Sequence, residues 1–191
     1  MKVALYFGSF NPIHVGHLAL ANYLCEFGEV DELWFVVSPH NPFKQQDDLM
    51  DDDLRLQLVQ LAIKDYPKFK ACDVEFTMPR PSYTYHTLQK LQDLFPQYEF
   101  VLLMGADNWP NLKNWYHGDE ILAQNSIIVY PRPGYEIDTS NLPENVRFVD
   151  APQFDVSSTF IRQSLKAGKD VRFFLPSSVW PIISRTKQSL Y

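Results

Sequence analysis

The stretch Phe7-Gly8-Ser9-Phe10-Asn11-Pro12-Ile13-His14-Val15-Gly16-His17 decides the fold of this chain. The apolar run 3–7 before it predicts a buried strand, and the segment 18–24 after it predicts a helix. The stretch is therefore a turn from a strand into a helix. In α/β folds such turns bind phosphate groups, because the first turn of a helix offers unpaired N–H groups and the positive end of the helix dipole.

The residue types in this turn suit a bound phosphate. Gly8 lets a ligand approach the backbone closely, and Ser9 offers a hydroxyl. His14 and His17 flank the start of the helix with Gly16 between them, so two imidazoles can converge on one anion. Two alternatives stay open: surface histidines, or half of a zinc site, which would need further Cys, His or carboxylate ligands. Three histidines elsewhere show no paired spacing with these two: His40, His86 and His117.

The composition is that of an ordinary globular protein. The chain has 191 residues, 46% of them hydrophobic and 21% charged, which predicts a single domain over residues 1–191. The net charge of −6 argues against nucleic acid as a partner. No run has the shape of a signal peptide or the length of a membrane span, so we expect a cytoplasmic protein with no membrane partner. Cys25 and Cys72 are expected to be buried free thiols. A homo-oligomer stays open.

Predicted strands and helices alternate along the chain. The first helix ends near Phe27 and a buried strand follows at 33–37, which makes a βαβ unit and predicts a parallel sheet. Further strands are expected at 69–76, 98–104, 126–130 and 146–149. Further helices are expected at 51–66, after a cap at Ser82 or Thr84, near 121–122, from about 157, and after 176. The pattern predicts an α/β fold: a Rossmann-like, doubly wound, mostly parallel sheet with a C-terminal helical portion.

Polar and aromatic residues follow the later strands. Gly105 and Asp107 come at a strand end and suit a ribose or base edge, although a plain turn explains them too. Trp115 and Tyr116 can stack on a flat heterocycle or simply cover the core. Lys44 lies in the loop after the second strand, where it can reach a phosphate or remain solvated.

A second phosphate site is predicted late in the chain. Ser157, Ser158 and Thr159 are three consecutive hydroxyls at a helix start, which is more than one cap requires. Arg162 lies one turn further along. Helix N–H groups, hydroxyls and a guanidinium together favour a phosphate ligand.

Residues 14–17, His-Val-Gly-His, resemble the HxGH signature of the nucleotidyltransferases. Over nearly the whole chain, further motifs follow in the order seen in the bacterial nicotinate-mononucleotide adenylyltransferase family: Pro81-Ser82-Tyr83-Thr84, Gly105-Ala106-Asp107, Trp115-Tyr116, Arg132-Pro133-Gly134 and Ser157-Ser158-Thr159-Phe160-Ile161-Arg162. There are departures: Phe7 stands where that family usually has glycine, Phe43 where a histidine is common, and Gly-Ser-Phe-Asn-Pro at 8–12 looks more like the animal nicotinamide enzymes.

The resemblance implies a reaction of NAD synthesis. The 5′-phosphate of nicotinate mononucleotide attacks the α-phosphate of ATP, giving the deamido dinucleotide and pyrophosphate. Mg²⁺ is implied as the cofactor, bound through the ATP phosphates, with no protein ligand assigned. No side-chain nucleophile is needed, because the substrates carry the attacking and leaving oxygens, so catalysis should come from alignment and cationic donors.

The resemblance also implies a role for each matching residue. Catalysis is assigned to His14, His17, Lys44 and Arg162. ATP binding is assigned to Gly8, Ser9, Phe10, Gly16, Gly105, Asp107, Ser157, Ser158 and Thr159. Mononucleotide binding is assigned to Asn11, Thr84, Trp115, Tyr116 and Arg132, with Trp115 stacked on the pyridine ring.

Three other functions stay open at this point. The first is a preference for nicotinamide mononucleotide, or dual specificity. The second is another HxGH transferase that uses CTP or phosphopantetheine, which the segments 81–84 and 115–116 disfavour. The third is a nucleotide-binding sensor without turnover, which would need no histidine pair.

Overall fold

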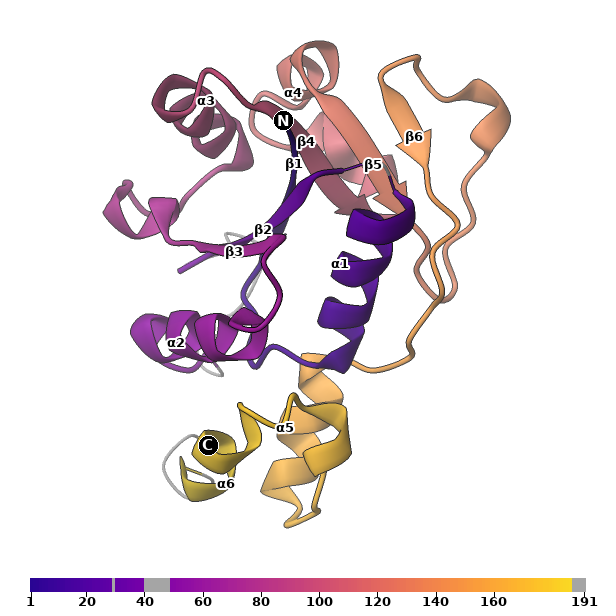
Figure 1. Ribbon diagram of the computed structural model, residues 1–191. Coiled ribbons are helices and arrows are strands. Elements are labelled where there is room, and N and C mark those ends of the chain that lie inside the picture. Colours follow the sequence, from indigo (N-terminus) through magenta and orange to yellow (C-terminus); the bar gives the residue numbers. More distant parts are fainter. Residues whose placement is uncertain (29, 40–48, 187–191) are drawn as a thin grey trace.

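A parallel sheet forms the centre of the molecule (Figure 1). The computed structural model describes residues 1–28, 30–39 and 49–186, and within them six strands pair in the order β3-β2-β1-β4-β5-β6. All the paired strands run parallel. Their bounds are β1 (Lys2–Gly8), β2 (Glu32–Val37), β3 (Phe69–Cys72), β4 (Glu99–Gly105), β5 (Ser126–Tyr130) and β6 (Val146–Phe148). The predicted doubly wound α/β fold is confirmed.

Helices cover both faces of the sheet. They are α1 (Val15–Phe27), α2 (Asp52–Ile63), α3 (Thr84–Leu94), α4 (Gly118–Gln124), α5 (Ser158–Lys166) and α6 (Trp180–Thr186). Short 3₁₀ turns are η2 (Val74–Thr77), η3 (Trp109–Asn114), η4 (Thr139–Asn141) and η5 (Arg172–Phe174). The last helices, α5 and α6, lie beyond the N-terminal end of α1 and form the predicted C-terminal helical portion (Figure 1).

The alternation of side chains along β1 creates two cores. Ala4 and Tyr6 belong to one buried cluster, which α1, α2, α5 and α6 complete. Val3 and Leu5 belong to the other, which α3 and α4 complete. Because successive strand residues point to opposite faces, one central strand supplies both layers. A central strand buried on both faces explains why residues 3–7 are continuously apolar.

The strand order places a crevice beside β1. The chain builds β2 and β3 on one side of β1 and then crosses to β4 on the other side. At such a switch point the connections leave in opposite directions, so a crevice opens at the carboxyl ends of the two strands. β1 ends at Gly8 and β4 at Gly105, so these residues mark its floor.

Two local predictions are wrong. The strand expected at 69–76 ends at Cys72, and residues 74–77 form η2, which turns a glutamate, Glu75, into the interior. Neither Ser82 nor Thr84 caps α3: Tyr83 is the capping residue, and it provides no side-chain hydrogen bond. The Ser82 hydroxyl instead donates to Glu75.

Other expectations on composition agree with the structure where it tests them. Cys25 and Cys72 are buried free thiols, and burial raises their pKa values to about 12 and about 11. Within the described ranges, none of the helices combines the length and apolar character needed to cross a bilayer.

Candidate active site

A cavity of about 970 Å³ opens at the carboxyl ends of β1 and β4. All but two of the predicted site residues line it. Gly16 instead lines a small hollow of about 40 Å³, which His14 and His17 line as well. Lys44 lies outside the described residues. Segments from both ends of the chain therefore meet at one cavity, at the place that the switch point predicts.

The histidine pair forms the start of α1 and is held by the backbone. The His14 and His17 rings stack with centroids 3.6 Å apart, and the His14 N–H donates to Nδ1 of His17 at 3.2 Å. An Nδ1 that accepts leaves the proton of a neutral ring on Nε2. His17 can therefore donate a hydrogen bond from Nε2 without first gaining a charge.

His14 is 5% exposed, and its environment keeps it neutral. Burial, with the positive charge of Arg132 as a smaller cause, lowers the pKa of His14 from 6.5 to about 4. Its Nδ1 is buried and has no hydrogen-bond partner within the part of the chain that the structure describes. An unpaired buried nitrogen beside a cavity is available to a ligand, because pairing would recover its lost hydration.

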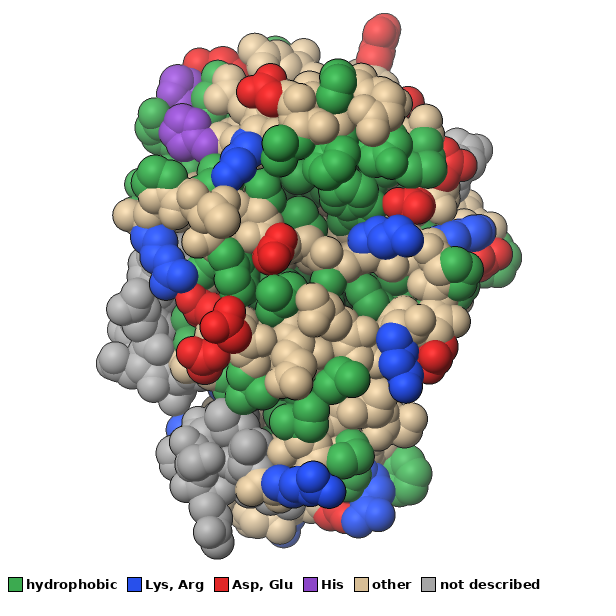
Figure 2. Space-filling model, turned by 60° about the vertical axis from the view of Figure 1, so that its left-hand side comes forward, with side chains coloured by type: hydrophobic (Ala, Val, Ile, Leu, Met, Phe, Trp, Pro, Cys, Tyr) green, Lys and Arg blue, Asp and Glu red, His purple; other side chains and the backbone are tan. Residues whose placement is uncertain are grey.

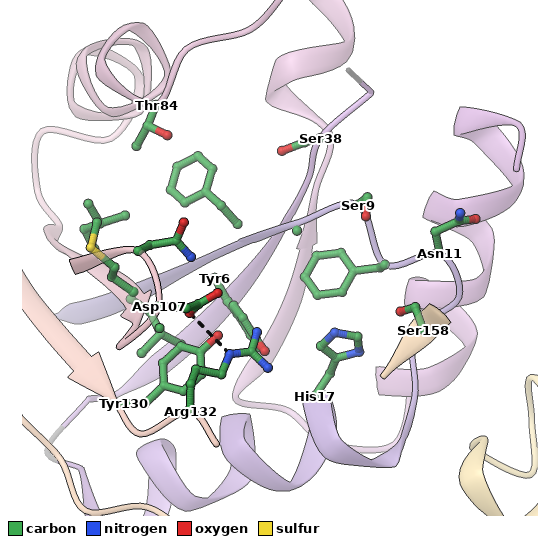
Figure 3. A pocket seen from close by; sticks show the side chains of 18 of the residues that line it. Tyr6, Ser9, Asn11, His17, Ser38, Thr84, Asp107, Tyr130, Arg132 and Ser158 are labelled. Carbon is green, nitrogen blue, oxygen red and sulfur yellow. Dashed lines mark ion pairs between the residues drawn. The ribbon is translucent and has the colours of Figure 1, made fainter. Parts of the chain in front are cut away.

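The start of α5 docks against the first turn. Ser157 caps the helix by accepting from the Phe160 N–H at 3.1 Å, as the sequence predicts. The Ser158 hydroxyl donates to the Pro12 carbonyl at 2.9 Å, and Nη1 of Arg162 donates to the Asn11 carbonyl at 3.0 Å. The two helix starts therefore face one cavity, with Ser158 close to the Ser9–Asn11 turn and His17 beneath them (Figure 3).

An ion pair lies on the floor of the cavity. Nε of Arg132 is 3.5 Å from Oδ1 of Asp107, and its guanidinium lies 5.2 Å from the centroid of the Tyr130 ring (Figure 3). A Cβ at Gly105 would lie 2.3 Å from that carboxylate oxygen, so a side chain at this position would displace the Asp107 carboxylate from its place beside Arg132. Arg132, which is predicted to bind the mononucleotide, thus pairs with Asp107, which is predicted to bind ATP.

Gly8 leaves room for an aromatic ring. A Cβ at Gly8 would lie 2.9 Å from the Phe10 ring, so that ring occupies the space over this glycine. Phe10 has a positive φ of 44°, an uncommon backbone conformation for a bulky residue. The bend folds the phenyl group back over β1, where it is 2% exposed. Gly8 is needed for packing of the turn as well as for any ligand.

Aromatic residues form the opposite end of the cavity. Thr84 begins α3 there, away from His17 (Figure 3), and Trp115 and Tyr116 line the same cavity. The Tyr116 ring is 46% exposed and lies 4.7 Å from the Tyr83 ring. The cluster continues outward through stacked Tyr85 and His117 and through His86. On the surface, histidine side chains gather beside apolar ones (Figure 2).

Sequence reasoning missed several residues that line the cavity or support its walls. Ser38 and Glu75 line it, and the fully buried Arg55 contacts the segments behind it. Ser38 carries a readable signal, since it is the first polar residue after a strand next to β1. Glu75 carries none, because a single carboxylate in an apolar segment is expected to be a solvated side chain.

Comparisons with known proteins identify the family of this chain. Residues 5–164 match the family model described as cytidylyltransferase-like. A Bacteroides fragilis protein named "Probable nicotinate-nucleotide adenylyltransferase" is 55% identical over 189 residues, which cover 99% of this chain and 94% of that protein. A Bacteroides thetaiotaomicron protein of the same name is 53% identical, with 96% and 91% covered. This chain belongs to the nicotinate-nucleotide adenylyltransferase family.

Solved structures share the fold. The nicotinic acid mononucleotide adenylyltransferase of Plasmodium falciparum, complexed with NaAD, superposes with a TM-score of 0.81 at 22% identity and covers 97% of this chain and 96% of its own. A structure described as a putative nicotinate-nucleotide adenylyltransferase from Vibrio parahaemolyticus gives 0.71 at 21% identity, covering 97% and 93%. The family's architecture is therefore retained at low sequence identity.

Proposed function

We propose that this chain joins ATP and nicotinate mononucleotide into nicotinate adenine dinucleotide and pyrophosphate, by direct attack of one phosphate on the other. One observation carries this proposal. The start of α1, with His14 and His17, and the start of α5, with Ser158 and Arg162, line one cavity, and two side-chain to backbone hydrogen bonds join α5 to the turn that precedes α1. Two helix starts that face one space suit a triphosphate, because both present N–H donors and positive dipole ends.

The histidine pair is proposed to stabilise the charge that develops at the α-phosphate. Neutral His17, with its Nε2 proton, donates a hydrogen bond, and the unpaired Nδ1 of His14 accepts or donates according to its tautomer. Arg162 supplies the permanent positive charge. Donors already fixed in place cost no reorganisation when the charge appears, and that is the main source of catalysis when no side chain attacks. Lys44 is proposed to add a second cation.

A magnesium ion is proposed to enter with ATP. At the phosphate end the walls offer hydroxyl, imidazole and guanidinium groups, and the carboxylate of Asp107 pairs with Arg132. Such walls can hold a hard cation only if phosphate oxygens and water supply most of its ligands. When bound, the ion would neutralise part of the triphosphate charge. Ser157, Ser158 and Thr159 would hold the phosphate oxygens that remain.

The aromatic end is proposed to take the mononucleotide. Trp115 would stack on the pyridine ring, and the first N–H groups of α3 at Thr84, with Tyr116, would meet its carboxylate. The ion pair of Asp107 and Arg132 lies between the two substrates, so we propose that Asp107 contacts the adenosine while Arg132 faces the mononucleotide. Both phosphates would then lie in line near His17.

Rates with two mononucleotides test this proposal. The purified chain is incubated with ATP, Mg²⁺ and either nicotinate or nicotinamide mononucleotide, and the dinucleotide and pyrophosphate are quantified. We expect equal amounts of both products and a kcat/KM at least about tenfold higher for the acid, which corresponds to about 1.4 kcal/mol of discrimination. A preference for the amide would transfer the assignment to nicotinamide mononucleotide.

The same assay separates an enzyme from a sensor. A folded protein that binds ATP but releases no pyrophosphate with either mononucleotide would be a nucleotide-binding module, and the proposal would fail. Product formed with CTP in place of ATP would instead favour another reaction of the wider family.

A further inference from the structure

Arg55 is a fully buried arginine that makes five hydrogen bonds, two of them to residues that line the cavity, Ser9 and Ser38. Its guanidinium donates to the Ser9 carbonyl at 2.6 Å, to the Ser38 carbonyl at 2.9 Å and to the Met50 carbonyl at 3.0 Å. The fourth bond goes to the carbonyl of Pro39 and the fifth to the carboxylate of Asp52. Arg55 thus ties the turn after β1 to the segment after β2.

Glu75 is a buried carboxylate, 2% exposed, on the other side of Ser38. One of its oxygens accepts from the Ser82 hydroxyl at 2.7 Å and the other from the Thr87 hydroxyl at 2.8 Å. The Ser38 hydroxyl is a third partner, and burial raises the pKa of this carboxyl. Within the described residues no cation lies within ion-pair distance of it. Glu75 thus ties the start of α3, which carries Thr84, to the end of β2.

Ser38 joins the two groups. Its N–H donates to the Gly8 carbonyl at 2.9 Å, its carbonyl accepts from Arg55, and its hydroxyl bonds to Glu75. One residue at the end of β2 therefore connects the phosphate turn with the mononucleotide wall. Ser38 itself lines the cavity, between Ser9 and Thr84 (Figure 3).

We propose that Arg55 and Glu75 are positioning residues for two different substrates: Arg55 sets the phosphate turn that receives ATP, and Glu75 sets the wall that receives the mononucleotide. This assignment rests on the proposed function for the identity of the substrates. Arg55 acts through the carbonyl of Ser9, which fixes the turn from Gly8 to Asn11. Glu75 acts through Ser82 and Thr87, which flank Thr84 in sequence.

Each of these two buried groups does more than support the core. A buried charged group is costly unless all its hydrogen bonds are made, and apolar residues would fill these volumes at lower cost. Both side chains instead form hydrogen bonds with segments that contribute residues to the cavity. A wall that moves by about 1 Å can slow an aligned reaction by about 100-fold, so fixed walls matter for this chemistry.

A crossed kinetic experiment tests the assignment. Initial rates are measured for the wild type, Arg55→Lys and Glu75→Gln, with each substrate varied while the other is saturating. We expect Arg55→Lys to raise the KM for ATP about tenfold and the KM for the mononucleotide less than about threefold, and Glu75→Gln to do the reverse. Each variant is the matched control for the other, because general loosening of the fold would move both constants together.

Two further variants make the same kinds of substitution at residues away from the cavity, as controls. Arg147→Lys changes an arginine that donates to the Gly28 carbonyl, away from the cavity, and Glu26→Gln changes a surface carboxylate that accepts from Tyr66. Neither residue lines the cavity, and both variants should match the wild type in both KM values. If Arg55→Lys fails to fold, Asp52→Asn replaces it, and if Glu75→Gln fails to fold, Thr87→Val replaces it. Each replacement should raise the KM for the same substrate, by a smaller factor.

Two results would overturn the assignment: equal changes in both KM values in each variant, or no change in either. Calorimetric titration of each variant with ATP and with nicotinate mononucleotide gives the two dissociation constants. These show directly which of the two ligands each variant binds more weakly. If the wild type forms no dinucleotide, the proposed function fails, and the titrations still decide whether Arg55 and Glu75 position separate ligands.

Discussion

The two ends of the cavity are built in different ways. At the phosphate end the groups are fixed by the backbone: Ser158 and Arg162 donate to carbonyls of the first turn, and His14 is 5% exposed. At the aromatic end the rings pack on one another, and Tyr116 is 46% exposed. The difference suggests a division of labour. We propose that charge is stabilised where the backbone fixes the donors, and that a flat substrate binds where the rings are exposed.

The largest effect is expected at the phosphate end. His17→Ala removes a donor that the backbone N–H of His14 holds in orientation, so kcat should fall about 100- to 1,000-fold. Steady-state rates measure this, and circular dichroism with thermal unfolding checks that the variant is folded. Near-normal turnover in a folded His17→Ala protein would remove the histidine from its assigned role and weaken the comparison.

The pH dependence of stability gives a second test of the phosphate end, because His14 is buried there. The folded-state pKa of His14 is about 4, below the usual 6.5, so the unfolded state binds this proton more readily. The stability that His14 contributes is therefore complete above pH 6.5 and is lost as the pH falls toward 4. The total loss should be on the order of 2–3 kcal/mol in the free energy of unfolding.

Urea unfolding from pH 7 to pH 4 measures this loss, with His14→Gln as the control that has no titrating ring. The wild type should lose more stability over that range than the variant. Identical slopes for the two proteins would mean that His14 titrates normally, and the phosphate end would then be more solvated than its burial indicates.

A smaller effect is expected at the aromatic end. Trp115→Ala should raise the KM for nicotinate mononucleotide about tenfold while changing kcat less than about threefold, because the ring binds ground state and transition state alike. Trp115→Phe should recover most of the affinity. A loss confined to kcat would contradict the division of labour, because it would place Trp115 among the groups that act on the transition state.

The smallest effect is expected at an exposed ion pair next to Arg55. Arg80 and Arg55 bind the same carboxylate, Asp52, but the side chain of Arg80 is 52% exposed and that of Arg55 is buried. Exposed ion pairs contribute about 0–1 kcal/mol, so Arg80→Met should change the free energy of unfolding by less than about 1 kcal/mol. Thermal unfolding tests this. A loss of several kcal/mol would show that the exposed ion pair stabilises the fold far more than its exposure predicts.

The sequence predicts the parts of this molecule that depend on local pattern. Continuous apolar runs identify β1 and β2 because those strands are buried on both faces, and the run of Ser157, Ser158 and Thr159 identifies the start of α5 because a cap needs a hydroxyl. The alternating pattern predicts a parallel, doubly wound sheet, whereas the strand order that places the cavity at the carboxyl ends of β1 and β4 comes from the structure.

What escapes prediction depends on long-range partners. Ser82 reads as a cap, yet its hydroxyl serves Glu75, seven residues away, because η2 turns that carboxylate inward. An arginine within a predicted helix is expected to be solvated. No local pattern indicates that the guanidinium of Arg55 donates to the carbonyls of Ser9 and Ser38. The assigned roles of the cavity residues, and that of Lys44, stay predictions.

The central claim is that this cavity aligns two phosphates and that no side chain attacks. The stereochemical course at the α-phosphorus of ATP tests it most directly, with ATP made chiral at that phosphorus and the configuration of the dinucleotide determined. Direct in-line attack by the mononucleotide predicts inversion of configuration. Retention would reveal two successive displacements through a covalent intermediate on the protein, and would contradict the account.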